Sequence, residues 1–205
     1  MVWLKNGRLR MTWYKKAKEE DPEYQKMKDF FDKRTNKHIE RVQKYCEKIE
    51  EFDSEIFMGL IDQAKDHDAS KFKDPEIEPY IYVTWGYKCK DDGVDFDPPE
   101  GMDDKMNEAT TYHVLHNSHH PEYHAGEDSE VINKEDRDSP VRDKIIDGTK
   151  MPDLDIGEMC ADWCSVSEEK GNNPEEWAKK NIGTRWKFNK DQEDLIYELI
   201  DEIWE

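Results

Sequence analysis

The sequence predicts an all-α fold, a helical bundle with long polar loops, and three observations support this class. Apolar residues recur at spacings of three and four along several segments, as they do on the buried face of a helix. Helix-start signals precede two of these segments, Asp21-Pro22 near the beginning and Asn189 with Gln192 near the end. No segment shows the alternating pattern of a half-buried strand.

The composition indicates a folded chain with a heavily charged surface. Charged residues make up 40% of the 205 residues and apolar residues 35%, values that alone are typical of disorder. Seven Trp, nine Tyr and seven Phe argue against disorder, because each aromatic side chain buries a large area. A single domain suits a chain of this length.

The net charge of −19 restricts the expected partners. A surface this negative repels nucleic-acid backbones and anionic membranes, so we expect neither a nucleic-acid polymer nor a membrane as partner. A small anionic substrate, such as a phosphorylated one, is compatible if metal ions and one or two cationic side chains reverse the local field. The sequence has no signal peptide and no long apolar run, which predicts a cytoplasmic protein.

The sequence predicts one domain with an N-terminal extension and a surface insertion. Residues 1–20 are an N-terminal extension, and residues 21–205 are one helical domain. Residues 125–150 are polar and charged, which predicts a surface insertion. The four cysteines lack zinc-binding spacing and are expected to be buried thiols.

The first predicted helix starts at Asp21-Pro22, because Pro suits the first turn of a helix. We expect a break in this helix near Asn36. His38 lies on the buried stripe, so its side chain should point inward. The apolar residues at helical spacing are Tyr24, Met27, Phe31, Val42, Tyr45 and Ile49.

A second helix is predicted over about residues 54–66, which places the dipeptide His67-Asp68 at the end of a core-facing helix. Residues 72–101 contain four prolines and three glycines, which predicts mostly loop with a short helix over residues 76–85. The expected apolar stripe of the second helix is Ile56, Leu60 and Ala64.

Three more helices are predicted in the rest of the chain. One covers about residues 103–118, a second follows Pro152, and the third begins with a capping box of Asn189 and Gln192. The stripe of the first contains Met106, Ala109, His113, His116 and His120. The buried face of the second contains Ile156, Met159, Trp163 and Val166, with Asp162 at its border. The apolar set of the third is Leu195, Ile196, Leu199, Ile200 and Ile203.

The histidines are concentrated in a way that indicates a metal site. Five of the seven fall within residues 113–124, and the other two are the inward His38 and His67, which is followed by Asp68. Imidazole and carboxylate together suit Mn, Fe, Co, Ni or Zn. A buried carboxylate beside histidines is costly unless a cation compensates its charge.

The order of these residues resembles the HD-domain superfamily, in which a His, a His-Asp pair and a later Asp follow one another on successive helices. The matching positions are His38, His67-Asp68 and Asp162. Three stretches also resemble an uncharacterised HD-like family common in phage and bacterial genomes, and a phage-encoded chain would work in the host cytoplasm. These stretches are residues 67–72 (His-Asp-Ala-Ser-Lys-Phe), 119–123 (His-His-Pro-Glu-Tyr) and 158–163 (Glu-Met-Cys-Ala-Asp-Trp).

The resemblance implies an HD-like helical bundle that holds one or two divalent transition-metal ions. Asp68 would bridge two ions. One ion would be held by His38, His67 and Asp162, and the other by His113 with either His119 or His120.

Two further residues are candidate catalytic groups. The resemblance implies that Lys71, three residues after Asp68, holds an anionic or polar substrate. Glu122 is a candidate for proton transfer, or for orienting a ligand histidine. We expect His116 and His124 to face solvent or to support ligands.

Three functions are compatible with these residues. The first is a metal-dependent phosphohydrolase acting on a nucleotide or another small phosphoester. The second is a diiron oxygenase, because the resemblance extends to the branch of the superfamily that contains such enzymes. The third is a non-enzymatic phage accessory protein with a structural metal and an acidic face that binds another protein. A site without an open coordination position would favour the third.

Overall fold

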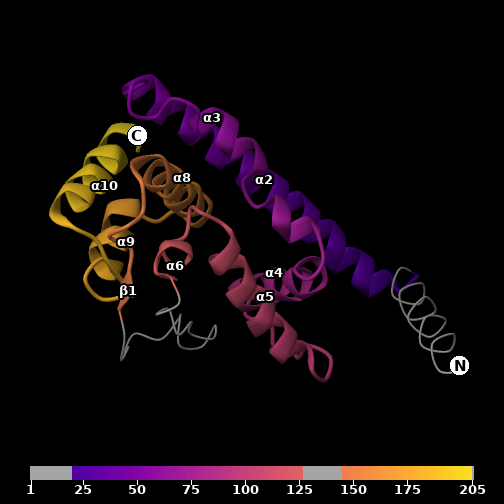
Figure 1. Ribbon diagram of the computed structural model, residues 1–205. Helices are drawn as coiled ribbons and strands as arrows, with labels where there is room; N and C mark the ends of the chain where they lie inside the picture. The colour runs from indigo at the N-terminus through magenta and orange to yellow at the C-terminus, as the bar shows by residue number, and fades with distance from the viewer. Residues whose placement is uncertain (1–19, 127–144, 205) are drawn as a thin grey trace, which may run out of the picture.

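The computed structural model describes residues 20–126 and 145–204, and Figure 1 shows a bundle of helices. These residues contain eight α-helices, two 3-10 turns and one sheet of two short strands, which confirms the all-α class. No helix of this part of the chain is long and apolar enough to cross a membrane. The predicted N-terminal extension, apart from Glu20, and residues 127–144 of the predicted insertion lie outside the described residues.

Helix α2 (Pro22–Phe52) is one continuous helix of 31 residues. It starts as predicted, because the Asp21 side chain accepts the backbone N–H of Glu23 and Pro22 occupies the first turn. The predicted break near Asn36 is wrong. Asn36 lies on the exposed face, where its side-chain amide donates to the backbone carbonyl of Asp32 without interrupting the helix.

The segment after α2 differs from the predicted second helix. Helix α3 covers only Leu60–Gln63, and two 3-10 turns follow at Ala64–Asp66 and Ala69–Phe72. The Asp53 carboxylate accepts the backbone N–H groups of Glu55 and Ile56, as at a helix N-terminus, but only a turn follows, and Gly59 with a φ of 95° separates this turn from α3. Ile56 is therefore 49% exposed, against the prediction, and Phe57 is buried in its place.

Helix α4 (Ile77–Asp91) is longer than the predicted short helix, whereas α5 (Met102–His116) closely matches its prediction. Pro79 lies in the first turn of α4, where a missing N–H leaves no helical hydrogen bond unmade. Helix α4 packs against α2, and α5 packs against α4. The shared apolar cluster consists of Met27, Phe31, Tyr80, Ile81, Tyr82, Val83, Trp85, Cys89, Met102 and Ala109.

Helix α8 (Asp153–Lys170) lies between α2 and the helices α9 (Pro174–Asn181) and α10 (Lys190–Ile203), as Figure 1 shows. The predicted capping box of α10 is confirmed, since Asn189 and Gln192 accept each other's backbone N–H groups. Helix α9 was not expected from the sequence. The predicted burial of Val166 on α8 is wrong, because this 40% exposed side chain lines a cavity.

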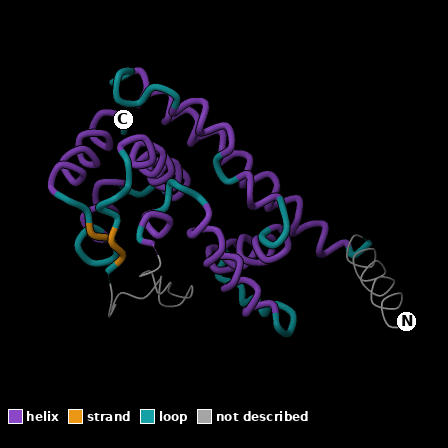
Figure 2. The backbone as a smooth tube through the Cα atoms, viewed as in Figure 1, coloured by secondary structure: helices purple, strands orange, loops and turns teal. Residues whose placement is uncertain are grey.

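A short helix and a small sheet complete the fold. Helix α6 covers Pro121–His124, and strands β1 (Ile146–Asp147) and β2 (Trp186–Lys187) pair in parallel, shown in orange in Figure 2. The sequence pattern did not predict these strands, because a strand of two residues is too short to show alternation. Ile146 is buried, so the end of the predicted surface insertion belongs to the core.

A second apolar cluster joins the C-terminal half of α2 to α8 and α10, and three of the four cysteines belong to it. All four cysteines are buried and free, as predicted, and burial raises the pKa of Cys164 to about 12. The large side chains of this second cluster include Tyr45, Ile49, Phe57, Leu60, Met159, Trp163, Trp186 and Phe188. His38 lies in α2 between Phe31, which belongs to the first cluster, and Val42, which belongs to the second.

Gly157 allows α8 to approach the turn before α3 closely. A Cβ atom at this position would lie 3.1 Å from side-chain atoms of Phe57 and Leu60. We expect Gly157→Val to lower the free energy of unfolding by about 1–3 kcal/mol, because the packed contact cannot accept the added atoms. Urea unfolding followed by tryptophan fluorescence measures this loss.

The matched control for this prediction is Gly86→Ala in α4, where the added Cβ would lie 3.7 Å from Phe96, an ordinary contact. That variant should keep or raise stability, by up to about 1 kcal/mol, since Ala favours helix more than Gly does. Wild-type stability of Gly157→Val would contradict the close packing of α8.

Candidate metal centre

The predicted metal-ligand residues come from three helices and two connecting segments, which meet between the two apolar clusters. His38 lies in the middle of α2, His113 near the end of α5 and Asp162 in α8. The dipeptide His67-Asp68 lies between the two 3-10 turns, and His119-His120 lies directly before α6.

The backbone at Asp68 adopts an uncommon conformation. Its φ of 57° is in the left-handed region, where Asp is tolerated better than most residues with a side chain. Such conformations cluster at functional sites, where the surrounding structure holds them in place. The conformation ends one 3-10 turn and begins the next, and it leaves His67 Nε2 and Asp68 Oδ2 3.8 Å apart.

Four side chains, the first ligand set, direct one atom each toward a common point. His38 Nε2 lies 3.1 Å from Asp162 Oδ1, 3.3 Å from His67 Nε2 and 3.5 Å from Asp68 Oδ2. His67 Nε2 lies 4.0 Å from Asp162 Oδ1. Ligand atoms that share one ion at about 2.0–2.2 Å lie about 3.0–4.2 Å from one another. The distances from the two histidines to each other and to both carboxylates therefore fit one metal ion, and His38, His67 and Asp68 have ligand atoms within 4.8 Å of one another.

Hydrogen bonds on the far side of each ring orient the two histidines. His67 Nδ1 lies 2.7 Å from Glu158 Oε1, so it carries the proton and donates it to this carboxylate. His38 Nδ1 lies 3.0 Å from Ser165 Oγ, which also contacts the backbone carbonyl of His38 and accepts a hydrogen bond from Arg41 Nε. Where both rings are neutral with Nδ1 protonated, the two Nε2 atoms present lone pairs to each other at 3.3 Å, an arrangement that a shared proton or a metal ion between them relieves.

A second ligand set shares Asp68 with the first and adds three histidines of residues 113–120. His113 Nε2 lies 3.1 Å from Asp68 Oδ1, and both atoms are buried without a hydrogen-bond partner. His119 Nε2 lies 4.0 Å from the same oxygen. The ligand atoms of His113, His119 and His120 lie within 4.8 Å of one another, so the structure brings both adjacent histidines to the site. Asp68 thus presents Oδ2 to the first set and Oδ1 to the second.

Two buried glutamates orient ligand histidines, and sequence reasoning missed both. Glu76 Oε2 lies 2.8 Å from His113 Nδ1, which leaves Nε2 free to face Asp68. Glu158 Oε1 lies 2.7 Å from His67 Nδ1 and 3.4 Å from His119 Nδ1. Carboxylates commonly accept the second ring N–H of a histidine that binds metal, and the two glutamates are placed to do this. Helical spacing offered one signal, since Glu158 precedes Asp162 by one turn.

The carboxylates at this centre are held in the ionised form. Burial alone would raise the pKa of Asp68, but the charges of Lys71 and His67 outweigh it and hold the pKa well below its usual range. Burial would also raise the pKa of Asp162 and of Glu158. Hydrogen bonds and charges of the neighbouring histidines outweigh it, from His38 at Asp162 and from His119 and His67 at Glu158, so the pKa of both carboxylates is lowered. Several negative charges in one buried place require positive charge nearby.

Lys71 supplies part of this positive charge. Its ammonium donates to Asp68 Oδ2 at 2.6 Å and lies 5.1 Å from the centre of the Tyr80 ring. The resemblance implied that Lys71 holds an anionic or polar substrate. The structure places it at the cavity wall in direct contact with the central carboxylate.

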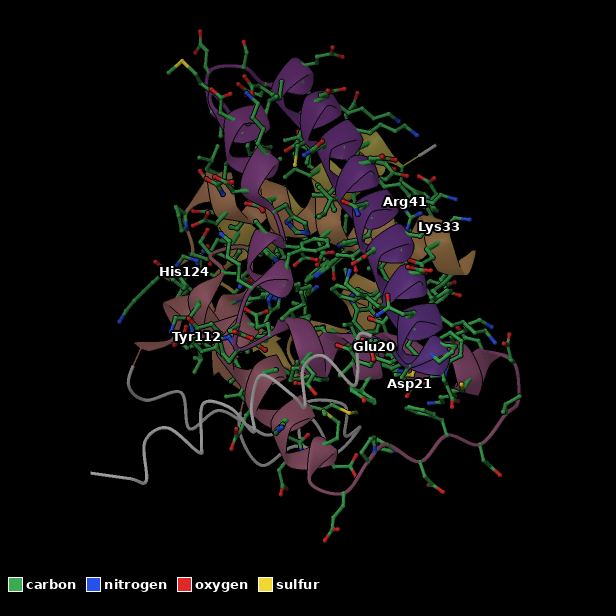
Figure 3. The ribbon with its side chains drawn as sticks, turned by 90° about the vertical axis from the view of Figure 1, so that its right-hand side faces the viewer. Glu20, Asp21, Lys33, Arg41, Tyr112 and His124 are labelled. Atoms are coloured by element: carbon green, nitrogen blue, oxygen red, sulfur yellow. The ribbon has the colours of Figure 1, made fainter. Side chains whose placement is uncertain are left out.

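Glu122 lies apart from the ligand atoms. It is buried, its Oε1 accepts a hydrogen bond from Trp186 Nε1, and it is not among the residues that line the cavity. This position suits support of the loop before α6 better than proton transfer to a substrate. His116 is exposed and stacks on Tyr112, while His124 contacts Ser118 and Asp155, as expected for residues that are not ligands. In Figure 3, Tyr112 and His124 lie on the opposite side of the view from Arg41 and Lys33.

A cavity of about 1080 Å³ borders both ligand sets. Its lining includes His38, Asp68, His113, His119 and Asp162. A small molecule in this cavity can therefore reach the ligand atoms, as at a catalytic metal site with an open position.

The fold and this centre define a helical protein with buried His, Asp and Glu clusters that could hold metal ions. Residues 27–202 match the model of the Family of unknown function (DUF5662), and the chain belongs to this family. The matched range contains every residue of the two ligand sets. Comparisons with curated proteins and with solved structures gave no match.

Proposed function

We propose that the chain is a metal-dependent phosphohydrolase of the HD type that acts on a nucleotide or another small phosphoester. The observation that carries this proposal is the position of Asp68, whose two oxygens face the two ligand sets beside an open cavity. A carboxylate between two groups of histidines is suited to bridge two divalent ions, such as Mn, Fe, Co, Ni or Zn.

The chain contributes orientation and charge to this chemistry. Divalent ions, when bound, lower the pKa of a water toward about 7 and neutralise charge on phosphoryl oxygens. Glu76, Glu158 and Ser165 keep the imidazole rings in the orientation that directs Nε2 into the centre. The cavity admits the substrate to the same atoms. Metal ions and basic side chains in the cavity also reverse the local field for an anionic substrate on a chain of net charge −19.

Lys71 has two roles in this proposal, one in each state of the site. Without metal, its ammonium compensates the buried charge of Asp68. When metal is bound, its positive charge would compensate Asp68 in place of Lys71 and would repel the ammonium. Since Lys71 lines the cavity, the freed ammonium can then make a charge-assisted contact to a phosphate oxygen of the substrate.

Lys71→Ala separates these roles. We expect metal content to be retained and kcat/KM for phosphoesters to fall by about 10- to 1000-fold, because the variant loses the cationic contact to the substrate. Lys73→Ala, at an exposed position two residues further, is the matched control and should keep wild-type kinetics. Full activity of Lys71→Ala would contradict the substrate contact.

The function itself is tested by phosphate or nucleoside release from a panel of nucleotides and small phosphoesters. Each substrate is supplied to protein loaded with Mn, Fe, Co, Ni or Zn. We expect turnover with at least one metal and its loss on chelation. Absence of release from every phosphoester with every metal would contradict the phosphohydrolase proposal.

A diiron oxygenase is the second candidate, favoured by the mixed nitrogen and oxygen atoms of the two ligand sets. An iron-loaded, oxidised sample would then be coloured, and turnover would consume oxygen. The cavity beside the ligands favours either enzyme over an accessory protein with a closed structural metal.

A further inference from the structure

The cavity extends well beyond the space that a phosphate group needs at the ligand atoms. Its lining continues along α8 from Asp162 to Lys170 and then to residues 171–173 and α9. At a rise of about 1.5 Å per residue, Asp162 and Lys170 are about 12 Å apart along the helix axis. The volume of about 1080 Å³ is at the upper end of what drug-sized ligands occupy. The outer end therefore has room for a second part of the substrate.

Large aromatic side chains line this outer end and are left partly exposed. Trp177 of α9 is 40% exposed and Tyr87 of α4 is 39% exposed. Helix α9 buries Pro174, Ala178 and Asn181 on its other face, so packing of the core does not require Trp177. A flat, partly exposed aromatic surface at a cavity wall is suited to stacking against a planar ring.

The charge of the lining differs from that of the whole chain. The cavity has five basic side chains and four acidic ones, a net charge of +1, whereas the chain has −19. Two of the four carboxylates, Asp68 and Asp162, belong to the ligand sets and would be compensated by metal. Lys180 lies one helical turn beyond Trp177 and forms no ion pair with the described residues. The cavity is thus suited to an anionic ligand that also carries a planar ring.

We propose that the outer end of the cavity binds the base of a nucleoside phosphate, with the base stacked on Trp177 and the phosphate at the ligand sets. This inference rests on the proposed phosphoester specificity and narrows it to nucleotides. A nucleotide carries its base at one end and its phosphate at the other, with the ribose between them. The cavity has the matching order, with an aromatic wall at α9 at one end and the histidines at the other. Trp177 is then a residue that determines specificity and does not hold metal.

The test compares two probes that carry the same slowly hydrolysed anionic group, adenosine 5′-phosphorothioate and ribose 5-phosphorothioate. Calorimetry measures the binding of both to the metal-loaded full chain. Wild-type protein should bind the adenosine probe about 5- to 100-fold more tightly, the range typical of stacking of one base on an aromatic side chain. Trp177→Ala should remove this preference without changing metal content or affinity for the ribose probe, and Trp177→Phe should restore part of it.

Phe52→Ala is the matched control, because Phe52 is 41% exposed and lies at the end of α2, outside the cavity lining. It should keep the wild-type preference. Equal affinities of the wild type for both probes, no binding of either, or a preference that survives in Trp177→Ala would overturn the proposal. A preference for adenosine without hydrolysis of any phosphoester would instead remove the phosphohydrolase function and leave the base site in place.

Discussion

Asp68→Asn is expected to abolish binding of both metal ions and to lower phosphoesterase kcat/KM by at least about 1000-fold. Asp68 presents one oxygen to each ligand set, so a single substitution affects both sites. An amide is neutral and offers one oxygen only, which cannot bridge two cations. Asn tolerates the left-handed backbone at this position, so the turn at residues 67–68 should survive.

Asp66→Asn provides the control for this substitution, because it makes the same chemical change at an exposed position two residues earlier. It should keep wild-type metal content and activity. Metal content by elemental analysis and initial rates on the same preparations measure both quantities. An Asp68→Asn protein that still held two equivalents of metal would show that Asp68 does not bridge.

Removal of metal is expected to lower the melting temperature by about 5–10 °C. An ion present at 100 times its dissociation constant stabilises the native state by about 2.7 kcal/mol, and one kcal/mol corresponds to about 2–4 °C for a domain of this size. The site also loses the charge that compensates Asp68, Asp162 and Glu158, and these carboxylates then repel one another. Thermal scans with and without a chelator measure this shift.

Asp68→Asn again serves as the reference for this scan. Because the variant is expected to hold no metal, chelator should leave its melting temperature unchanged. A wild-type melting temperature that does not respond to chelator, or an equal response of the variant, would contradict stabilisation by metal at this centre.

The inward position of some candidate ligand residues could be predicted from the sequence because local patterns determine where they lie. His38 falls on the apolar stripe of a long helix, and His113 falls on the stripe of the third predicted helix. The break expected near Asn36 was wrong because one polar residue on the exposed face costs a helix little. The resemblance supplied the grouping of ligands around Asp68, which no spacing along the chain indicates.

The residues that orient the candidate ligands could not be predicted, because their role depends on contacts with residues that are distant in the sequence. Glu76 and Glu158 stand among 50 acidic residues, and the sequence does not distinguish a buried glutamate from a solvated one. Their partners His113 and His67 are 37 and 91 residues away along the chain. The turn at residues 53–59 was missed for a local reason, since Gly59 adopts a left-handed φ of 95° and α3 begins only after it.

Elemental analysis of the full chain, purified without added metal and again after loading with Mn, Fe or Zn, tests the metal centre most directly. The two ligand sets predict between one and two equivalents of transition metal per chain after loading, lost in Asp68→Asn and retained in Asp66→Asn. Less than about 0.2 equivalent in the loaded wild type would contradict the metal centre, and with it the proposed hydrolase.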